Sequence, residues 1–253
     1  MFDEAITLAY QMSVGEALRY KTEVLSTQSI QEEGQAPQKA QSQLEITMLQ
    51  SVKAVSPDGQ MTVDVTIEKG TMQRDGQVMT LPTVGQTITI VMKKSGEIVR
   101  TSVDFPFSQP AFPERSVKLK DSWTGDSKMD IPLYDNDGNQ TGNKQVTLTY
   151  NYTLNGFEQA LGYETAAIHV SCPTETIELQ PGVEQKITAK GVTNFGHKQG
   201  RLVKSRVETE TEITAPGASV STAIRVTVEL IEAKGPEGGG GSLPGSDEMF
   251  LIR

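Results

Sequence analysis

The sequence has almost none of the residues that build disulfide frameworks or catalytic centres. Among 253 residues there is one cysteine, Cys172, so no intramolecular disulfide can form. The two histidines, His169 and His197, lie in no H-E-x-x-H motif, and no G-x-S-x-G elbow occurs. His169 and Cys172 are three positions apart in an expected strand, which places them on opposite faces and prevents chelation. We therefore expect no enzyme activity, no metal site and no cofactor.

Clusters of positive charge and long apolar runs are also missing. Lys and Arg number 23 against 32 Asp and Glu, a formal net charge of −9, which disfavours nucleic acids and anionic membrane surfaces as partners. No run of about eighteen apolar residues occurs, so we expect no membrane-spanning helix. The N-terminus lacks the basic and apolar regions of a secretory signal.

Alternation of apolar and polar residues is what the chain has in place of helical spacing. This pattern predicts half-buried strands, and it is found at residues 6–12, 44–48, 61–67, 88–92, 146–154, 166–170, 202–207 and 224–231. A short helix over Phe2 to Ala9 is the alternative at the N-terminus. Turn sequences rich in Gly, Asn and Asp separate the strands, at residues 56–59, 74–76, 94–96, 137–139, 154–156 and 198–200. The chain is predicted to be all-β, built from consecutive antiparallel hairpins.

An internal repeat accounts for the length. Residues 96–104 match residues 200–208 in their Gly, Val, basic, hydroxyl and acidic positions, and three further segments match at nearly the same offset. We predict two tandem homologous β units, residues 1–104 and 117–234, arranged as a curved sheet, a sandwich or an incomplete barrel. The Pro- and Phe-rich linker, residues 105–116, is expected to pack on the sheets.

The C-terminal residues 235–253 combine a Gly-rich tether with an apolar, strand-like peptide. One interpretation is a disordered tail or a cloning remnant. The other is that the peptide docks as an added strand or in a groove, on its own body or on a neighbouring copy. The docking residues would then be Met249, Phe250, Leu251 and Ile252.

Methionine is frequent, and the side chains at three positions could line an apolar cavity together with the single tryptophan, namely Met48, Met61, Met92 and Trp123. Core packing is the simpler interpretation, and the repeat aligns Trp123 with Leu18, which also favours a core position. Residues 135–139 are read as a hairpin turn, with weak calcium binding as the alternative. Glu208, Glu210 and Glu212 alternate with threonines, as on the solvent face of a strand.

A loose resemblance covers most of residues 14–232. A Gly-Glu or Lys-Asp pair leads into Leu18-Arg19-Tyr20 or Trp123, a long strand pair follows, and a Gly-x-[Ile/Leu]-Val-[Arg/Lys]-[Thr/Ser] strand comes late. This pattern resembles uncharacterised bacterial envelope proteins with LolA/LolB-like curved sheets. The resemblance implies an extracellular or cell-surface protein with an incomplete barrel and a lipophilic ligand.

Two classes of function follow, both without catalysis. In the first, the chain is a structural protein that assembles with itself into filaments or large oligomers through the C-terminal peptide. In the second, it is a carrier or binding module for an apolar, lipid-like ligand in a Met-lined cavity. A weaker alternative makes the peptide an address that directs the protein to a shell or a larger partner. We expect assembly, because a simple carrier does not require a tethered apolar strand.

Overall fold

The computed structural model of the chain describes residues 5–101, 110–134 and 139–235. These residues form strands and turns, which confirms the all-β prediction. The strands are β1 (Ala17–Glu32), β2 (Gln38–Val55), β3 (Met61–Arg74), β4 (Gln77–Thr80), β5 (Thr87–Met92), β6 (Ile98–Thr101), β7 (Ser122–Tyr134), β8 (Gln140–Ala160), β9 (Tyr163–Gln180), β10 (Val183–Gly196), β11 (Arg201–Ala215) and β12 (Ala218–Lys234).

All twelve strands belong to one antiparallel sheet, in the order β6-β5-β3-β2-β1-β12-β11-β10-β9-β8-β7, with β4 paired to β3. The first six strands and the last six therefore extend in opposite directions from a central seam, where β1 pairs with β12 from Ala17 to Glu32. The two expected units are thus parts of a single sheet, and the duplication itself stays a prediction. Within the described residues, β6 and β7 are the edges and do not pair, so the sheet is not closed into a barrel.

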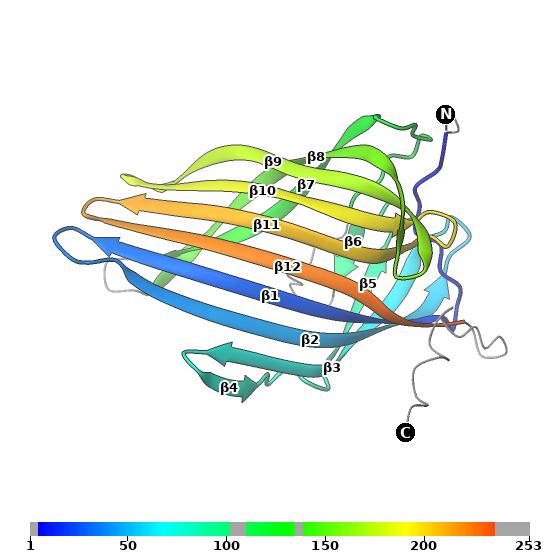
Figure 1. Cartoon of the computed structure of the whole chain (residues 1–253), viewed down its shortest axis with the longest axis horizontal. Coiled ribbons are helices and arrows are strands. Elements are labelled where there is room, and N and C mark those ends of the chain that lie inside the picture. Colours follow the sequence, from blue (N-terminus) through cyan, green and yellow to red (C-terminus); the bar gives the residue numbers. More distant parts are fainter. Residues whose placement is uncertain (1–4, 102–109, 135–138, 236–253) are drawn as a thin grey trace, which may run out of the picture.

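The sheet is strongly curved, with one face turned inward (Figure 1). One hydrophobic core cluster joins Ile90 of β5, Leu18 of β1 and Leu154 of β8, although these strands are well separated in the sheet order. Strand residues of the same parity share a face, and the side chains of this cluster lie on the face that the curvature brings together. This inner face is buried most deeply at the end of the sheet where the N-terminus lies.

The N-terminal segment fills that end, and here the sequence prediction was wrong in part. Residues 6–12 form neither a ladder strand nor a helix, because only Ile6 bridges another residue, Val117. The expected alternation does hold, since Leu8, Tyr10 and Met12 are all buried in the core. We call residues 5–13, together with residues 110–117, the plug.

The plug replaces ladder hydrogen bonds by bonds to two turns. Tyr10 N–H donates to Lys94 O at 2.8 Å, and Gln11 N–H donates to Gly200 O at 2.9 Å. From the linker, Phe112 N–H donates to Ser95 O at 2.7 Å, and the Phe112 ring stacks on Tyr10 with centroids 5.3 Å apart. The expectation that the linker packs on the sheets is confirmed for Phe112, while Phe105 and Phe107 lie outside the described residues.

Glycine gives the plug the room it needs at both turns. Gly96 and Gly200, the two glycines that the repeat aligns, have φ of 89° and 63°. A Cβ on Gly96 would lie 2.4 Å from Pro110 O, and a Cβ on Gly200 would lie 2.5 Å from Gln11 N. Both positions therefore need glycine for its backbone conformation and for its lack of a side chain.

Most expected turns are confirmed by residues with positive φ, including Gly59 and Gly76. The turn expected at residues 154–156 was wrong. Leu154 pairs with Ile168 and Gly156 with Ala167, so Asn155 is the extra residue of a β-bulge inside β8. Bulges favour the same permissive residues as turns, which is why the sequence pattern misleads. The actual turn follows at Leu161–Gly162, with φ of 49° and 81°.

Candidate binding trough

Five cross-strand rows make up the inner face of β2, β1, β12, β11 and β10 beyond the plug. The row nearest the plug is Ile46–Thr22–Val228–Ser205–Thr193, and the next is aliphatic, Leu44–Val24–Val226–Val207–Gly191. Three rows follow toward the hairpin tips: Ser42–Ser26–Ile224–Thr209–Ala189, Ala40–Gln28–Thr222–Thr211–Ile187 and Gln38–Ile30–Val220–Ile213–Gln185. From Thr22 to Ile30 the rows span about 27 Å, at ~3.4 Å per residue.

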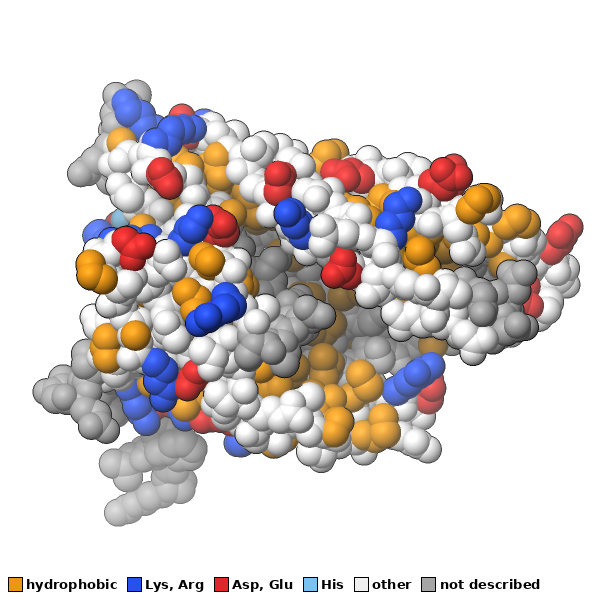
Figure 2. Space-filling model, turned by 180° about the vertical axis from the view of Figure 1, so that it is seen from behind, with side chains coloured by type: hydrophobic (Ala, Val, Ile, Leu, Met, Phe, Trp, Pro, Cys, Tyr) orange, Lys and Arg blue, Asp and Glu red, His pale blue; other side chains and the backbone are white. Residues whose placement is uncertain are grey.

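None of the side chains in these five rows is charged. The intervening residues of the same strands point to the outer face, which carries the charges, at Lys21, Glu23, Lys39, Glu45, Lys186, Lys190, Lys204, Arg206, Glu208, Glu210, Glu212, Arg225 and Glu229. Seen from behind, the molecule is hollowed, with hydrophobic side chains gathered inside and charged groups around the hollow (Figure 2). We call the part of this hollow that the five uncharged rows line the trough.

The trough is half-buried rather than filled. Val24, Val226 and Val207 are partly exposed, unlike the fully buried residues under the plug. A second apolar cluster continues the inner face onto β8 and β9 and provides one wall, with Val146, Leu148, Cys172, Ile187 and Ala189 as its buried members. The structure therefore has a long uncharged surface that its described residues leave partly open to solvent.

A glycine in the aliphatic row allows two strands of this surface to pack closely. Gly191 lies in the aliphatic row, and a Cβ there would come within 2.3 Å of Arg206 O and 2.8 Å of Val207 Cα. Those contacts are with the backbone of β11, which cannot move without disturbing the ladder. Gly191 thus permits close packing of β10 on β11 at this row.

Two buried polar side chains on the inner face lack hydrogen-bond partners among the described residues. Thr22 Oγ1, in the row nearest the plug, is fully buried, and Gln185 Oε1, in the row nearest the tips, belongs to a side chain only 9% exposed. An unsatisfied buried acceptor or donor costs about 1–3 kcal/mol. Neither atom is exposed to solvent, so each carries this cost within the folded protein.

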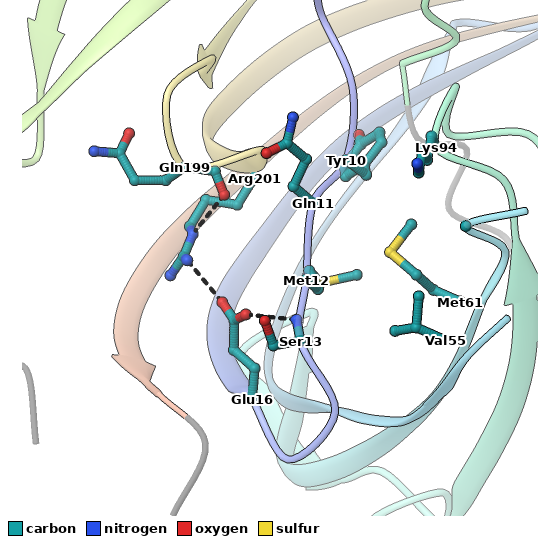
Figure 3. Close-up of a pocket in the computed structure, with 11 residues that line it drawn as sticks. Tyr10, Gln11, Met12, Ser13, Glu16, Val55, Met61, Lys94, Gln199 and Arg201 are labelled. Carbon is teal, nitrogen blue, oxygen red and sulfur yellow. Dashed lines mark hydrogen bonds and ion pairs between the residues drawn. The ribbon is translucent and has the colours of Figure 1, made fainter. Parts of the chain in front are cut away.

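A smaller cavity of about 440 Å³ lies at the plugged end, between the plug, the start of β3 and the turns that hold the plug (Figure 3). Its polar groups hold the chain in place: Arg201 Nη2 lies 2.7 Å from Glu16 Oε1, and Glu16 Oε2 accepts the Ser13 N–H at 3.0 Å. These bonds tie the plug to β11. We assign this cavity a structural role.

A depression of about 720 Å³ lies on the outer face, over the same strands near their tips. Lys39, Lys186, Glu210 and Glu212 all line it, so neither sign of charge dominates. Glu210 and Glu212 are exposed, which confirms that this side of β11 faces solvent.

The methionines and the tryptophan expected to line a cavity lie on the inner face beneath the plug. Met48, Met61, Met92 and Trp123 are all buried in the main core cluster, and Met61 also borders the small cavity at the plugged end. The Trp123 indole N–H donates to Ala111 O at 2.7 Å, and the ring stacks on Tyr152. The docking residues Met249 to Ile252 lie outside the described residues, as do residues 135–138 of the expected loop.

His169 and Cys172 point to opposite faces of β9, as predicted, with His169 exposed and Cys172 buried. His197 packs edge-on against Phe157, and burial lowers the pKa of its imidazole. No group of three or more acidic, His or Cys side chains among the described residues is arranged to hold a metal ion. In the same residues, no helix is long and apolar enough to cross a membrane.

Sequence reasoning missed the trough because it sought a site in rare residues. The available signal was in β11, where Val203, Ser205, Val207, Thr209 and Thr211 alternate with charged residues. That pattern predicts an uncharged face. It does not say that the face stays partly uncovered.

The chain matches no protein-family model and no curated protein. Among solved structures it is similar to lipovitellin, in a structure of lipid–protein interactions, with a TM-score of 0.48 and 10% identity over 92% of this chain and 27% of that one. It is also similar to DynF of the dynemicin pathway of Micromonospora chersina, with a TM-score of 0.24 and 7% identity over 89% and 84% of the two chains. For the translocator domain of the autotransporter NalP from Neisseria meningitidis the TM-score is 0.23 and the identity 7%, over 86% and 88%.

The chain spans about a quarter of the lipovitellin chain, 27%. Similarities this weak carry no argument about function. The resemblance to bacterial envelope proteins and the expected cell-surface location stay predictions.

Proposed function

We propose that the protein is a non-catalytic binding protein that holds an apolar, lipid-like molecule along the trough. The observation that carries this proposal is the set of five inner-face rows on β2, β1, β12, β11 and β10, which hold no charged side chain and are largely half-exposed beyond the plug. Covering such a surface is favourable by about 25 cal/mol for each Å² of apolar area removed from water. A ligand of elongated shape fits a trough about 27 Å long, at ~3.4 Å per residue.

The plug supports this proposal, because it closes one end of the curved sheet and leaves the rest accessible. Tyr10, Phe112 and Phe195 form an aromatic cluster there, with centroid separations of 4.5 to 5.3 Å. A ligand would therefore enter from the side of the hairpin tips or between the β6 and β7 edges.

The edge strand β7 is poorly suited to accept the C-terminal peptide as an added strand, which weakens the case for self-assembly. Asp126, Lys128 and Asp130 are exposed along it, and Pro132 cannot donate to a ladder. At its start, Arg115 Nη2 already donates to Ser122 O at 3.3 Å. These features hinder the addition of another strand at this edge.

A pair of neighbouring residues tests the proposal. Val24 lies in the trough, whereas Leu25 lies on the outer face and is 40% exposed. In the full-length protein, Val24→Lys should abolish binding of an environment-sensitive apolar dye and of lipids recovered by extraction and mass spectrometry. Leu25→Lys should bind both as the parent does. Should Val24→Lys fail to fold by circular dichroism, Val226→Asn serves in its place.

Equal binding by the two variants would refute the proposal. The peptide itself is a competing occupant, and replacing Met249, Phe250, Leu251 and Ile252 by serine distinguishes it. Stronger dye binding by that variant would mean that the peptide occupies the trough. Loss of large oligomers in light scattering would instead support self-assembly.

A further inference from the structure

The rows of the trough differ in chemistry along its length. The row that holds Val24 and Val207 is entirely aliphatic apart from Gly191. The next two rows toward the hairpin tips are rich in hydroxyl and amide groups, contributed by Ser26, Gln28, Ser42, Thr209, Thr211 and Thr222. A hydrocarbon chain suits the first region, and a polar but uncharged group suits the second.

We infer that the ligand is an uncharged amphiphile, with its hydroxyl- or amide-bearing head over the threonine and serine rows and its chain over the aliphatic row. This inference rests on the proposed function and specifies the class of ligand. Phosphate or carboxylate heads are disfavoured, because a buried anion needs a cationic partner. Within the strand segments that form the five rows, every Lys and Arg side chain lies on the outer face.

The hydroxyl groups of the trough are half-buried, which affects the strength of the hydrogen bonds that they form. Thr209 and Thr211 are partly exposed and pair across the sheet with Ile224 and Thr222. Hydrogen bonds formed in such a partly desolvated site contribute about 0.5–1.5 kcal/mol each. Two or three of them would raise the affinity for the right head by about tenfold or more.

Three ligands with the same acyl chain test this inference in the full-length protein: monomyristoylglycerol, methyl myristate and myristate. Displacement of a bound apolar dye at neutral pH gives their affinities. We expect monomyristoylglycerol to bind about tenfold more tightly than either of the others, with little dependence on salt concentration.

A matched pair of double variants locates the head. Thr209→Val with Thr211→Val removes two hydroxyls from the trough, while Thr27→Val with Thr214→Val removes two from the outer face. The first pair should abolish the preference for monomyristoylglycerol over methyl myristate, and the second should leave it intact. Methyl myristate should bind equally to both variants.

The outcomes separate the two proposals. Tightest binding of myristate, or an unchanged preference in the trough variant, would overturn the inference about the head and leave the proposed function standing. Binding of none of the three ligands would overturn both. Equal binding of monomyristoylglycerol and methyl myristate would also contradict the inference, because the hydroxyl rows would then play no part in recognition.

Discussion

Arg201 Nη2 lies 2.7 Å from Glu16 Oε1, and both side chains are largely buried, at 17% and 7% exposure. The pair joins the residue before β1 to the first residue of β11, so it connects the plugged end of the molecule across the seam of the sheet. Removing one partner from a buried ion pair leaves an uncompensated charge.

We therefore expect Arg201→Ala to lower the free energy of unfolding by about 3–5 kcal/mol. Urea denaturation followed by circular dichroism measures this change. The combined variant Glu16→Gln with Arg201→Met should recover part of the loss, since no charge is left unpaired. If Arg201→Ala alone is nearly neutral, the pair does not hold the plug.

Alanine substitution at two glycines with positive φ distinguishes the cost of backbone strain from the cost of steric overlap. Gly200, with φ of 63°, contacts the plug, whereas Gly76, with φ of 78°, has no atom within 4 Å of a built Cβ. Substitution by alanine at either site costs about 1 kcal/mol for the left-handed conformation. Gly200→Ala should cost a further 1–3 kcal/mol, roughly, through overpacking against Gln11. Similar melting temperatures for the two variants would mean that the plug yields easily.

A second glycine, Gly142, serves as the control for substitution of the trough glycine, Gly191. Gly191→Ala places a Cβ against the backbone of β11, and Gly142→Ala meets nothing within 4 Å. We expect Gly191→Ala to destabilise the protein by about 1–3 kcal/mol and Gly142→Ala to change it little. Hydrogen exchange of β10 and β11 amides should show the loosening locally. Equal stability of the two variants would argue against tight packing at this row.

Acid should weaken an ion pair that spans β2 on the outer face. Arg19 of β1 donates to both carboxylate oxygens of Glu68 on β3, at 2.6 and 2.9 Å, and also pairs with Glu232 of β12. The hydrogen bonds from Arg19 lower the pKa of Glu68 below its ordinary value of 4.5. This stabilisation is present above that ordinary value and is lost as pH falls through the lowered pKa of the folded state.

Unfolding midpoints between pH 6 and pH 2 test that relationship. The parent protein should lose stability more steeply below about pH 4 than Arg19→Met, which has no charge to hold Glu68 ionised. Parallel pH profiles for the two proteins would show that the pair contributes nothing measurable.

Tyrosine ionisation provides a further measurement. Burial raises the pKa of Tyr152 to about 12, and burial also raises the pKa values of Tyr10 and Tyr20. Absorbance titration of the native protein should therefore show fewer tyrosines ionising near pH 10 than the chain in denaturant. Tyr152→Phe should remove one late-titrating group without changing the early phase.

The sequence predicted the strands well because alternation is a local property. Met61, Val63 and Val65 mark β3, and the solvent side of β11 was read correctly from Glu210 and Glu212. Asn155-Gly156 misled because a bulge and a turn favour the same residues. A curved sheet was one of three predicted arrangements, but the sequence did not predict that both units share it, since the pairing of Ala17 with Lys234 joins positions that no local pattern connects.

The candidate site was harder to predict for a related reason. Met48 and Met92 suggested a cavity by their chemistry, but packing beneath the plug is a property of the tertiary structure. The trough depends on where Val24, Val226 and Gly191 meet across strands. The sequence of a single segment does not determine that register.

The segregation of charge also has a consequence for folding. Sliding β1 by one residue against β12 would turn Lys21 and Glu23 into the hollow and move Val24 to the outer face, because side chains alternate with a period of two. Each buried charge without a partner would cost several kcal/mol. Long strands with repetitive Thr and Val content are otherwise prone to slip. The charges on the outer face thus make every pairing of these strands that is shifted by an odd number of residues unstable.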